Sequence, residues 1–406
     1  MGKANESKQK YIVLGALFFT WIICYLDKLS MNVAIIPIAE EFKLNDTQSG
    51  LIISAFFLSY AMMQLVGGFL SDKYGARKVI LVSVVLWSIL TVATGFAWSF
   101  ISLIVIRILF GLGEGSFPAA SSVAVADNFP KAERGRAKST LTAATTIGAM
   151  ISSFIAAAFI THLGWRILFF SFGALGLLIT IVLYFVLNPN SATEKAATKV
   201  PIKQLLQKPL VWLLLVMYFG VSIVNWGLTT WMPTYMVKEK HLDLVSMGAL
   251  AVIPALVALL STLTTGWLVD KLPSGKEKLL IIIGSIIAAI SLFSLANVET
   301  ITMVVVFQSV TYIGLMLATT TILTMPLKYL PNEIIGTSVG FINFGGQIAG
   351  ALSPAVIGLI ITLSNGSYTG VFIFLTIMVL IPIIAALKLH SGIRLAVEGN
   401  TNTSMS

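Results

Sequence analysis

Long apolar stretches recur along almost the entire chain, and they restrict its fold more than any other feature of the sequence. They cover residues 11–39, 47–71, 78–97, 100–126, 137–160, 165–187, 209–236, 244–268, 278–296, 300–326, 337–362 and 367–388. A helix needs about 20 apolar residues to cross a bilayer, so each stretch is long enough for one span. The sequence therefore predicts an all-α integral membrane protein with twelve transmembrane helices.

The composition excludes a water-soluble enzyme. Only 11% of the 406 residues are charged and 57% are apolar, whereas a soluble domain carries about 25% charged residues. The single cysteine, Cys24, excludes an internal disulfide or a cysteine-ligated metal site, and the three histidines lie in separate loops or the tail. Nothing in the sequence resembles a set of nucleophile, base and orienting group. We expect no catalysis, no cofactor and no metal.

The net charge of +9 is spread over loops, so it does not indicate a nucleic-acid partner. Of the 26 basic residues, 20 fall in the two termini and in alternate loops on one side. Four fall on the other side, namely Lys43, Arg166, Lys238 and Lys240. Basic residues concentrate on the cytoplasmic side of membrane proteins. We therefore expect both termini in the cytoplasm and the protein in the cell membrane.

One long polar connection divides the twelve stretches into two sets of six. It runs from Asn188 to Lys208 and is basic. The expected organisation is a six-helix bundle at 1–187, a cytoplasmic linker at 188–208, a second six-helix bundle at 209–388 and a cytoplasmic tail at 389–406.

Two loop motifs occur once in each half. The sequence GFLSDKYGARK (68–78) between the second and third stretches is echoed by GWLVDK (266–271) between the eighth and ninth. The sequence PKAERG (130–135) is echoed by PNEIIG (331–336). Such recurrence at matching loops indicates a duplicated six-helix unit, as in many secondary transporters.

Two sets of six helices and the first loop motif resemble the major facilitator superfamily over essentially the whole chain. In that fold two pseudo-symmetric six-helix bundles surround a central cavity. We expect Asp72 to cap or pair at cytoplasmic helix ends, in a network whose breakage lets the halves open. The expected gating residues are Gly68, Asp72, Gly75, Arg77 and Asp270.

Four charged residues fall inside predicted spans of the first half: Asp27, Lys28, Arg107 and Glu114. A charge at the bilayer centre costs at least about 2.5–3.5 kcal/mol, so such residues usually face a cavity and serve function. Arg107 and Glu114 are seven residues apart, about 10 Å along one helix, and cannot form a tight pair within it. Either could reach a neighbouring helix, and a purely structural pair is the alternative.

Acidic and basic groups in one cavity suit a proton-coupled anion carrier. Carboxyl groups in a partly dehydrated cavity can take up and release protons near physiological pH. Lysine and arginine supply fixed positive charge for an anion. Protonation of the acid would then free the base from its carboxylate partner.

The residues around these charges resemble the anion:cation symporter family, which includes carriers of sugar acids, hexuronate and galactonate. The motifs are YLDK (25–28), Ser59-Tyr60 with Gln64, and RILFGLGEG (107–115) followed by Phe117-Pro118. The resemblance implies protonation at Asp27 and Glu114, a link between Arg107 and Glu114, and a substrate-facing hydroxyl on Tyr60. Gln64 joins Lys28, Tyr60 and Arg107 as a candidate substrate ligand.

Two positions depart from that family. Most members carry arginine where this chain has Lys28, and lysine lacks the bidentate geometry of arginine toward a carboxylate. Sugar-acid members often place an amide on the fifth span, where this chain offers Thr142, Thr145 and Thr146.

The second half shows no buried charge in the sequence, and its candidate substrate ligands are neutral. They are Asn225 and Trp226 on the seventh span and Asn343 on the eleventh. Asn343 lies in a glycine-rich stretch that resembles the eleventh span of the family. Gln308, Thr311 and Gln347 are polar too, but membrane helices also use amides to pack.

The sequence as a whole predicts a proton-coupled symporter that imports an organic anion, most of all a sugar acid, by alternating access. We expect it to act as a monomer in the lipid bilayer. An exporter of drugs or metabolites on the same fold is one alternative, although cations in the cavity oppose it. A nutrient sensor that binds without transporting is another.

Overall fold

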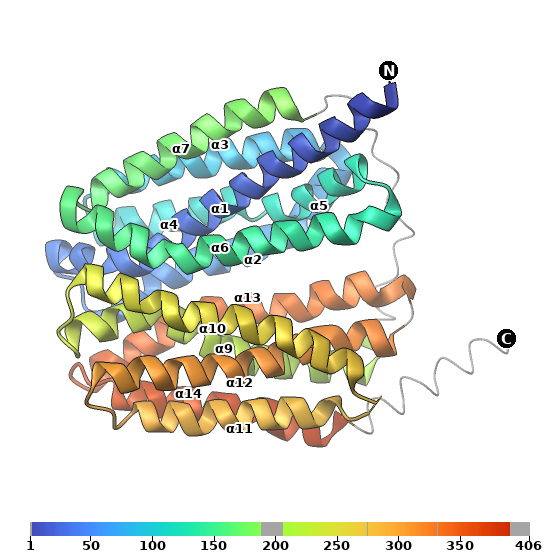
Figure 1. Ribbon diagram of the computed structural model, residues 1–406. Helices are drawn as coiled ribbons and strands as arrows, with labels where there is room; N and C mark the ends of the chain where they lie inside the picture. Colours follow the sequence, from blue (N-terminus) through green and yellow to red (C-terminus); the bar gives the residue numbers. More distant parts are fainter. Residues whose placement is uncertain (1, 188–205, 274, 331, 390–406) are drawn as a thin grey trace. The chain divides into compact units, whose positions relative to one another are not determined.

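The computed structural model describes residues 2–187, 206–273, 275–330 and 332–389, and the regular structure in these ranges is helical (Figure 1). The expected linker at 188–208 and tail at 389–406 fall almost entirely outside the described residues. By their contacts the residues divide into two compact units.

Among the described residues, the first unit contains seven helices and also residues 243–249, which include the first turns of α10. Its helices are α1 (Gly2–Phe42), α2 (Asp46–Tyr74), α3 (Ala76–Gly95), α4 (Phe100–Glu114), α5 (Phe117–Asn128), α6 (Lys131–Leu163) and α7 (Trp165–Val186). Within the unit α1 packs against α6 and α7, while α3 packs against α7 and α4 against α2. Helix α1, which carries Asp27 and Lys28, is thus enclosed by its neighbours.

The second unit contains the other six helices of the described chain, with α10 from Leu250 onward. They are α9 (Pro209–Lys238), α10 (Leu244–Lys271), α11 (Glu277–Leu295), α12 (Ile301–Tyr329), α13 (Asn332–Leu363) and α14 (Thr369–Leu387). Here α9 packs against α13 and α14, and α11 packs against α12 and α14.

Eleven helical segments of the described chain are long and apolar enough to cross a membrane. One of them, Phe100–Asn128, joins α4 and α5 across a break at Gly115 and Ser116. Helix α2 makes a twelfth span if its two arms, Asp46–Gln64 and Val66–Tyr74, count as one despite a bend of 47°.

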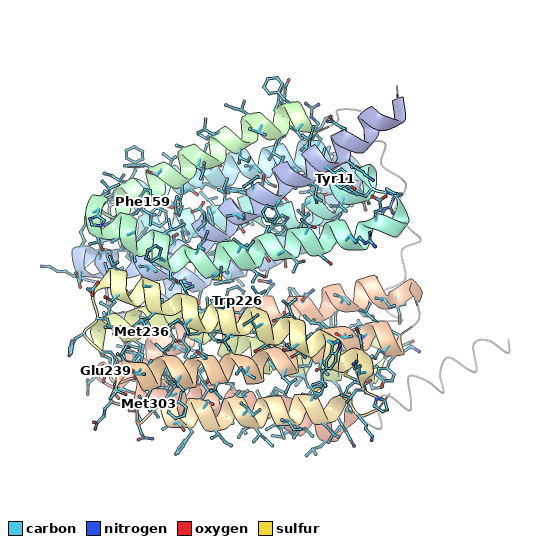
Figure 2. All side chains as sticks on the ribbon, viewed as in Figure 1. Tyr11, Phe159, Trp226, Met236, Glu239 and Met303 are labelled. Carbon is cyan, nitrogen blue, oxygen red and sulfur yellow. The ribbon has the colours of Figure 1, made fainter. Side chains whose placement is uncertain are left out.

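The outer faces of these helices are apolar. Phe185 is 77% exposed and Leu387 is 70% exposed, and side chains of this kind project all along both units (Figure 2). Water does not tolerate such extended apolar surface, whereas lipid does. The exposed faces therefore meet the hydrocarbon of a bilayer.

Short polar signals fix where helices begin and end. Asn45 is the N-cap of α2, and its side chain accepts a hydrogen bond from the Gln48 backbone at 2.8 Å. The Gln48 side chain accepts one from the Asn45 backbone in return, which completes a capping box. Ser99 and Ser102 form the same arrangement at the start of α4. Gly75, in the first loop motif, has a φ of 84°, which side-chain-bearing residues rarely adopt, and it separates α2 from α3.

One close helix contact positions the functional site. At Gly111 of α4, an added Cβ would lie 2.5 Å from the carbonyl oxygen of Phe56 and 2.8 Å from the amide nitrogen of Tyr60. Because glycine occupies this position, α4 can pack directly on the backbone of α2. Glu114 lies three residues further on, almost one turn, and so reaches the same level as Tyr60.

Candidate functional site

The four charged residues predicted inside spans are all buried in the first unit. Asp27, Arg107 and Glu114 are each 1% exposed, and Lys28 is 6% exposed. They come from two helices, α1 and α4, with α3 supplying further contacts.

Lys28 and Glu114 form a buried ion pair. The Lys28 Nζ lies 2.7 Å from the Glu114 Oε1. The Cys24 thiol donates to the same oxygen at 3.2 Å, because Cys24 precedes Lys28 by one turn on α1. The resemblance in the sequence implies Arg107 as the partner of Glu114, but the ion pair of Glu114 is formed with Lys28. Positions 107 and 114 are separated by about 10 Å along α4, which is too far for a direct ion pair within that helix. Lys28 extends from a different helix, α1, and reaches Glu114.

Aromatic rings surround the Lys28 ammonium. Its nitrogen lies 4.2 Å from the ring centroid of Tyr60, 4.8 Å from that of Tyr25 and 5.5 Å from that of Phe56. Tyr60 is only 5% exposed. The ring faces of these residues attract the cation and keep it in place without adding a second negative charge. Tyr60 therefore contacts Lys28 through its ring.

Asp27 and Arg107 contact two threonines of α3. The Thr91 hydroxyl donates to the Asp27 Oδ2. The Arg107 guanidinium donates to the Thr94 Oγ1 at 2.6 Å. The guanidinium also lies 4.5 Å from the ring centroid of Phe110. Both threonines are fully buried.

Thr91, Thr94 and Cys24 were not among the site residues predicted from the sequence. The available signal was two hydroxyl residues three positions apart in an otherwise apolar span, which place both on one helix face. Threonine is common in membrane helices, where it bonds to the preceding turn, so the spacing alone does not identify charged partners.

Asp27 and Glu114 each use one carboxyl oxygen and leave the other unbonded within the described chain. The Asp27 Oδ1 and the Glu114 Oε2 have no hydrogen-bond partner there, and neither has the Arg107 Nε. An unbonded carboxylate oxygen away from water is costly, whereas the protonated form relieves that cost. Asp27 and Glu114 thus each keep one buried oxygen without a hydrogen-bond partner in the described part of the chain.

The neutral candidates lie at half-buried positions. Gln64 lies at the bend of α2, Asn225 and Trp226 lie on α9, and Asn343 lies on α13 (Trp226 is labelled in Figure 2). Within the second unit, α9 and α13 pack together, so the last three belong to neighbouring helices. The Asn225 carbonyl oxygen accepts a bond from the Thr229 hydroxyl at 2.7 Å.

The loop-motif residues lie at helix ends. Asp72 is exposed in the last turn of α2, and Asp270 is exposed near the end of α10. Arg77, in the first turn of α3, donates to the Tyr184 carbonyl oxygen at 2.7 Å and so links α3 to α7. Gly68 is half-buried on α2.

The expectation that the second half has no buried charge is wrong. Glu277, at the start of α11, is fully buried. Its carboxylate accepts from the Tyr329 hydroxyl at 2.9 Å and from the Gly275 amide at 2.8 Å, and it pairs with Lys328 at 3.3 Å. Glu277 falls just outside the predicted span, and folding of the α10–α11 turn onto the end of α12 buries it.

These features define a class of protein: a multi-pass α-helical membrane transporter, with ionised side chains buried among its spans. The model of the Major Facilitator Superfamily matches residues 17–354, and the chain belongs to that family. Being a transporter, the protein is not an enzyme.

Relatives named as anion transporters cover nearly the full chain. This chain is 29% identical over 390 residues to the "Probable sulfoacetate transporter" of Cupriavidus necator, and the alignment covers 89% of each chain. It is 28% identical to the "Hexuronate transporter" of Bacillus subtilis, covering 90% of this chain and 91% of the relative. It is 29% identical to the "Probable galactarate/D-glucarate transporter" of Escherichia coli K12, covering 87% and 88%.

A solved structure confirms the fold. A bacterial homologue of the human lysosomal transporter Spinster, in an inward-facing and unoccupied conformation, superposes with a TM-score of 0.82. The match covers 96% of this chain and 98% of that chain at 20% sequence identity. The predicted twelve-helix major facilitator fold is thus confirmed.

Proposed function

We propose that the protein is a proton-coupled symporter that imports an organic anion, with a sugar acid as the expected substrate. The observation that carries this proposal is the buried ion pair between Lys28 and Glu114, with Asp27 and Arg107 buried in the same unit. The names of its relatives support the substrate class, since sulfoacetate, hexuronate, galactarate and glucarate are all organic anions.

Coupling follows from charge balance at Lys28. When Glu114 takes up a proton, its ion pair with Lys28 is lost, and an uncompensated buried cation is strongly unfavourable. A substrate carboxylate at Lys28 restores the balance. Substrate and proton therefore stabilise each other's binding, and the site is best satisfied when both are present or both are absent. This is the requirement for symport.

Asp27 is the second proposed proton site, and Thr91 suits both of its charge states. The single hydroxyl hydrogen of Thr91 can point to Asp27 or to the Trp87 carbonyl oxygen, 2.9 Å away. When Asp27 is ionised, Thr91 donates to it. When Asp27 is protonated, its own hydroxyl donates to Thr91, which then donates to Trp87. The hydrogen bond between Asp27 and Thr91 is kept in both states.

The other roles are part of the same proposal. Lys28 and Arg107 hold the anion, and Tyr60, Gln64, Asn225, Trp226 and Asn343 contact the rest of the substrate. Residues 1–187 and 209–388 act as two bundles that rock during alternating access, joined by the linker 188–208. Gly68, Asp72, Gly75, Arg77 and Asp270 take part in gating. The protein acts as a monomer in the cell membrane, with both termini in the cytoplasm.

Uptake into liposomes tests the proposal directly. Purified protein is reconstituted and offered radiolabelled glucuronate, galactarate, sulfoacetate and neutral glucose, each with and without an inward proton gradient. We expect accumulation of at least one acid only with the gradient, and no accumulation of glucose. Gradient-independent accumulation, or transport of cationic or lipophilic compounds in place of acids, would contradict the proposal.

A further inference from the structure

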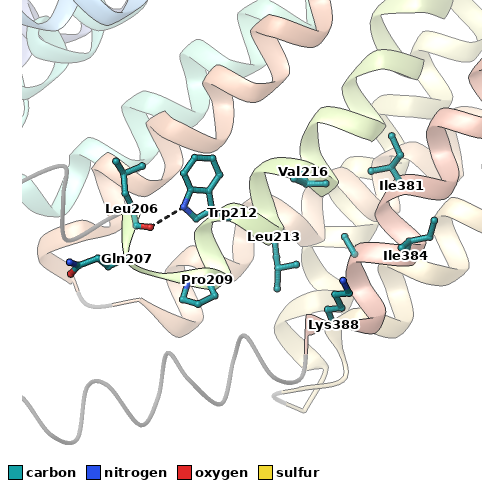
Figure 3. A pocket seen from close by; sticks show the side chains of 10 residues that line it. Leu206, Gln207, Pro209, Trp212, Leu213, Val216, Ile381, Ile384 and Lys388 are labelled. Atoms are coloured by element: carbon teal, nitrogen blue, oxygen red, sulfur yellow. Dashed lines mark hydrogen bonds between the residues drawn. The ribbon is translucent and has the colours of Figure 1, made fainter.

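A groove opens on the outer face of the second unit, between the start of α9 and the end of α14 (Figure 3). Its volume is about 760 Å³, within the usual range of ligand sites. Leu213 and Val216 of α9 form one wall, and Ile381 and Ile384 of α14 form the other. The residues along the spans are thus apolar.

Polar groups line only one end of the groove. Gln207 precedes α9 and Lys388 follows α14, and both are exposed. Among the described residues that line the groove, the charged side chain is that of Lys388. Apolar walls with a positive end fit an amphiphile whose head is anionic.

Trp212 marks the level of the membrane surface. Its indole nitrogen donates to the Leu206 carbonyl oxygen at 2.9 Å, drawn as a dashed line in Figure 3, while the ring lines the groove. Tryptophan collects at the boundary between hydrocarbon and headgroups. A head beside Lys388 would therefore lie at headgroup depth, with its tail along α9 and α14.

We propose that this groove binds one anionic glycerophospholipid, with an acyl chain between α9 and α14 and the phosphate beside Lys388. A lipid fits better than a small soluble anion, because most of the described lining is apolar and Trp212 and Ile384 are 45% and 62% exposed. In the orientation proposed above, the lipid belongs to the cytoplasmic leaflet. The groove is lined by described residues of the second unit and includes none of the buried charges of the first, so this proposal does not depend on the transport mechanism.

Native mass spectrometry of the full-length protein can test the site. The protein is mixed with equal amounts of phosphatidylglycerol and phosphatidylcholine of the same acyl chains, and the retained adducts are counted. Lys388→Gln removes the charge, and Lys276→Gln, at another exposed lysine of the second unit, is its control. Ile384→Trp fills the groove, and Ile377→Trp, two turns away on α14, is its control. Gel filtration establishes that each variant is folded.

Wild-type protein should retain phosphatidylglycerol in preference to phosphatidylcholine. Lys388→Gln should lower that preference about fivefold, the effect of one lysine near an anionic headgroup. Ile384→Trp should lose the adduct, while both controls behave as wild type. Equal retention of the two lipids by wild-type protein would overturn the proposal, as would equal effects of a variant and its control. Thermal stabilisation by glycerol 3-phosphate as great as that by phosphatidylglycerol would also overturn it, since it would show a site for a free anion.

Discussion

Thr91 and Thr94 lie on one face of α3 and contact charges of opposite sign. Thr94 accepts from Arg107 and donates to the Leu90 carbonyl oxygen at 2.9 Å, so its direction is fixed by a permanent cation. Thr91 faces a carboxyl group, and its hydroxyl can reverse between donor and acceptor. The two threonines thus contact a permanent cation and a carboxyl group.

Replacement of these threonines should separate the two roles. Thr91→Val should change the pH dependence of uptake and destabilise the protein by about 1–3 kcal/mol, because a buried carboxyl group loses its partner. Thr91→Ser keeps the hydroxyl and should restore the wild-type profile. Thr94→Val should weaken anion binding and leave the pH profile unchanged. Identical profiles for Thr91→Val and wild type would show that Asp27 does not titrate during transport.

Glu114→Gln should abolish accumulation driven by a proton gradient. Exchange of labelled for unlabelled substrate should persist, because exchange needs no net movement of protons. Asp27→Asn should be at least as damaging to accumulation. Glu41→Gln is the matched control, since Glu41 forms an exposed ion pair with Arg166 at 2.7 Å. Liposomes measure both modes, and normal accumulation by Glu114→Gln would place the proton elsewhere.

Lys28→Ala and Arg107→Ala should each weaken binding of the acid by about 2–3 kcal/mol, the strength of one charged hydrogen bond in a closed site. Lys28→Ala also leaves Glu114 unpaired, which destabilises the fold by about 3–5 kcal/mol. The double variant Lys28→Ala/Glu114→Gln should recover that stability without recovering binding. Calorimetry and thermal unfolding measure the two effects.

Two controls accompany the Lys28 and Arg107 variants, one for loss of a lysine elsewhere and one for the charge of the ligand. Lys43→Ala, at an exposed residue with a φ of 52° between α1 and α2, should bind the acid normally. The neutral sugar of the same skeleton should not compete in wild type. Competition by the neutral sugar as strong as that by the acid would refute the assignment of an organic anion.

The orientation can be tested at the two ends of α11. Lys276 precedes this helix and Glu299 follows it, and both are exposed. In a Cys24→Ser background, Lys276→Cys should react with an impermeant maleimide only after cell lysis, and Glu299→Cys should react in intact cells. Serine at position 24 can still donate to Glu114. The reverse labelling pattern would invert the proposed topology.

Gly75→Ala should destabilise the protein by about 1–3 kcal/mol, because its φ of 84° is strained for any residue with a Cβ. Gly68→Ala is the control, since Gly68 is helical and an added Cβ there meets nothing within 4 Å. Thermal unfolding of the two variants measures the difference. Equal melting temperatures would mean that the loop relaxes to accept alanine.

Much of the fold was predictable because the bilayer imposes a simple rule on sequence. Twelve apolar stretches predicted the number of spans. The polar connection at 188–208 predicted a division into two sets of six, which stays a prediction. The breaks were not predictable in the same way. The bend of α2 and the interruption between α4 and α5 leave the apolar stretches continuous, so length and hydropathy do not reveal them.

The buried charges were predictable as a set but not in their pairing. A charge in an apolar stretch is visible in the sequence, whereas its partner depends on which helices touch. Lys28 on α1 reaches Glu114 on α4 because both side chains are buried within the first unit. Glu277 was missed for the opposite reason, since it lies just before an apolar stretch and only the tertiary fold buries it.

Cys24 is the single cysteine of the chain, is 2% exposed, and lies 3.2 Å from the carboxylate that pairs with Lys28. Every thiol reagent added to the unmodified protein must therefore report on one place. Because Cys24 is buried beside Glu114, its rate of reaction should depend on how often solvent reaches the ion pair between Lys28 and Glu114. A bound substrate should lower that rate. Thiol labelling of the unmodified protein can therefore follow the solvent accessibility of this ion pair without any introduced cysteine.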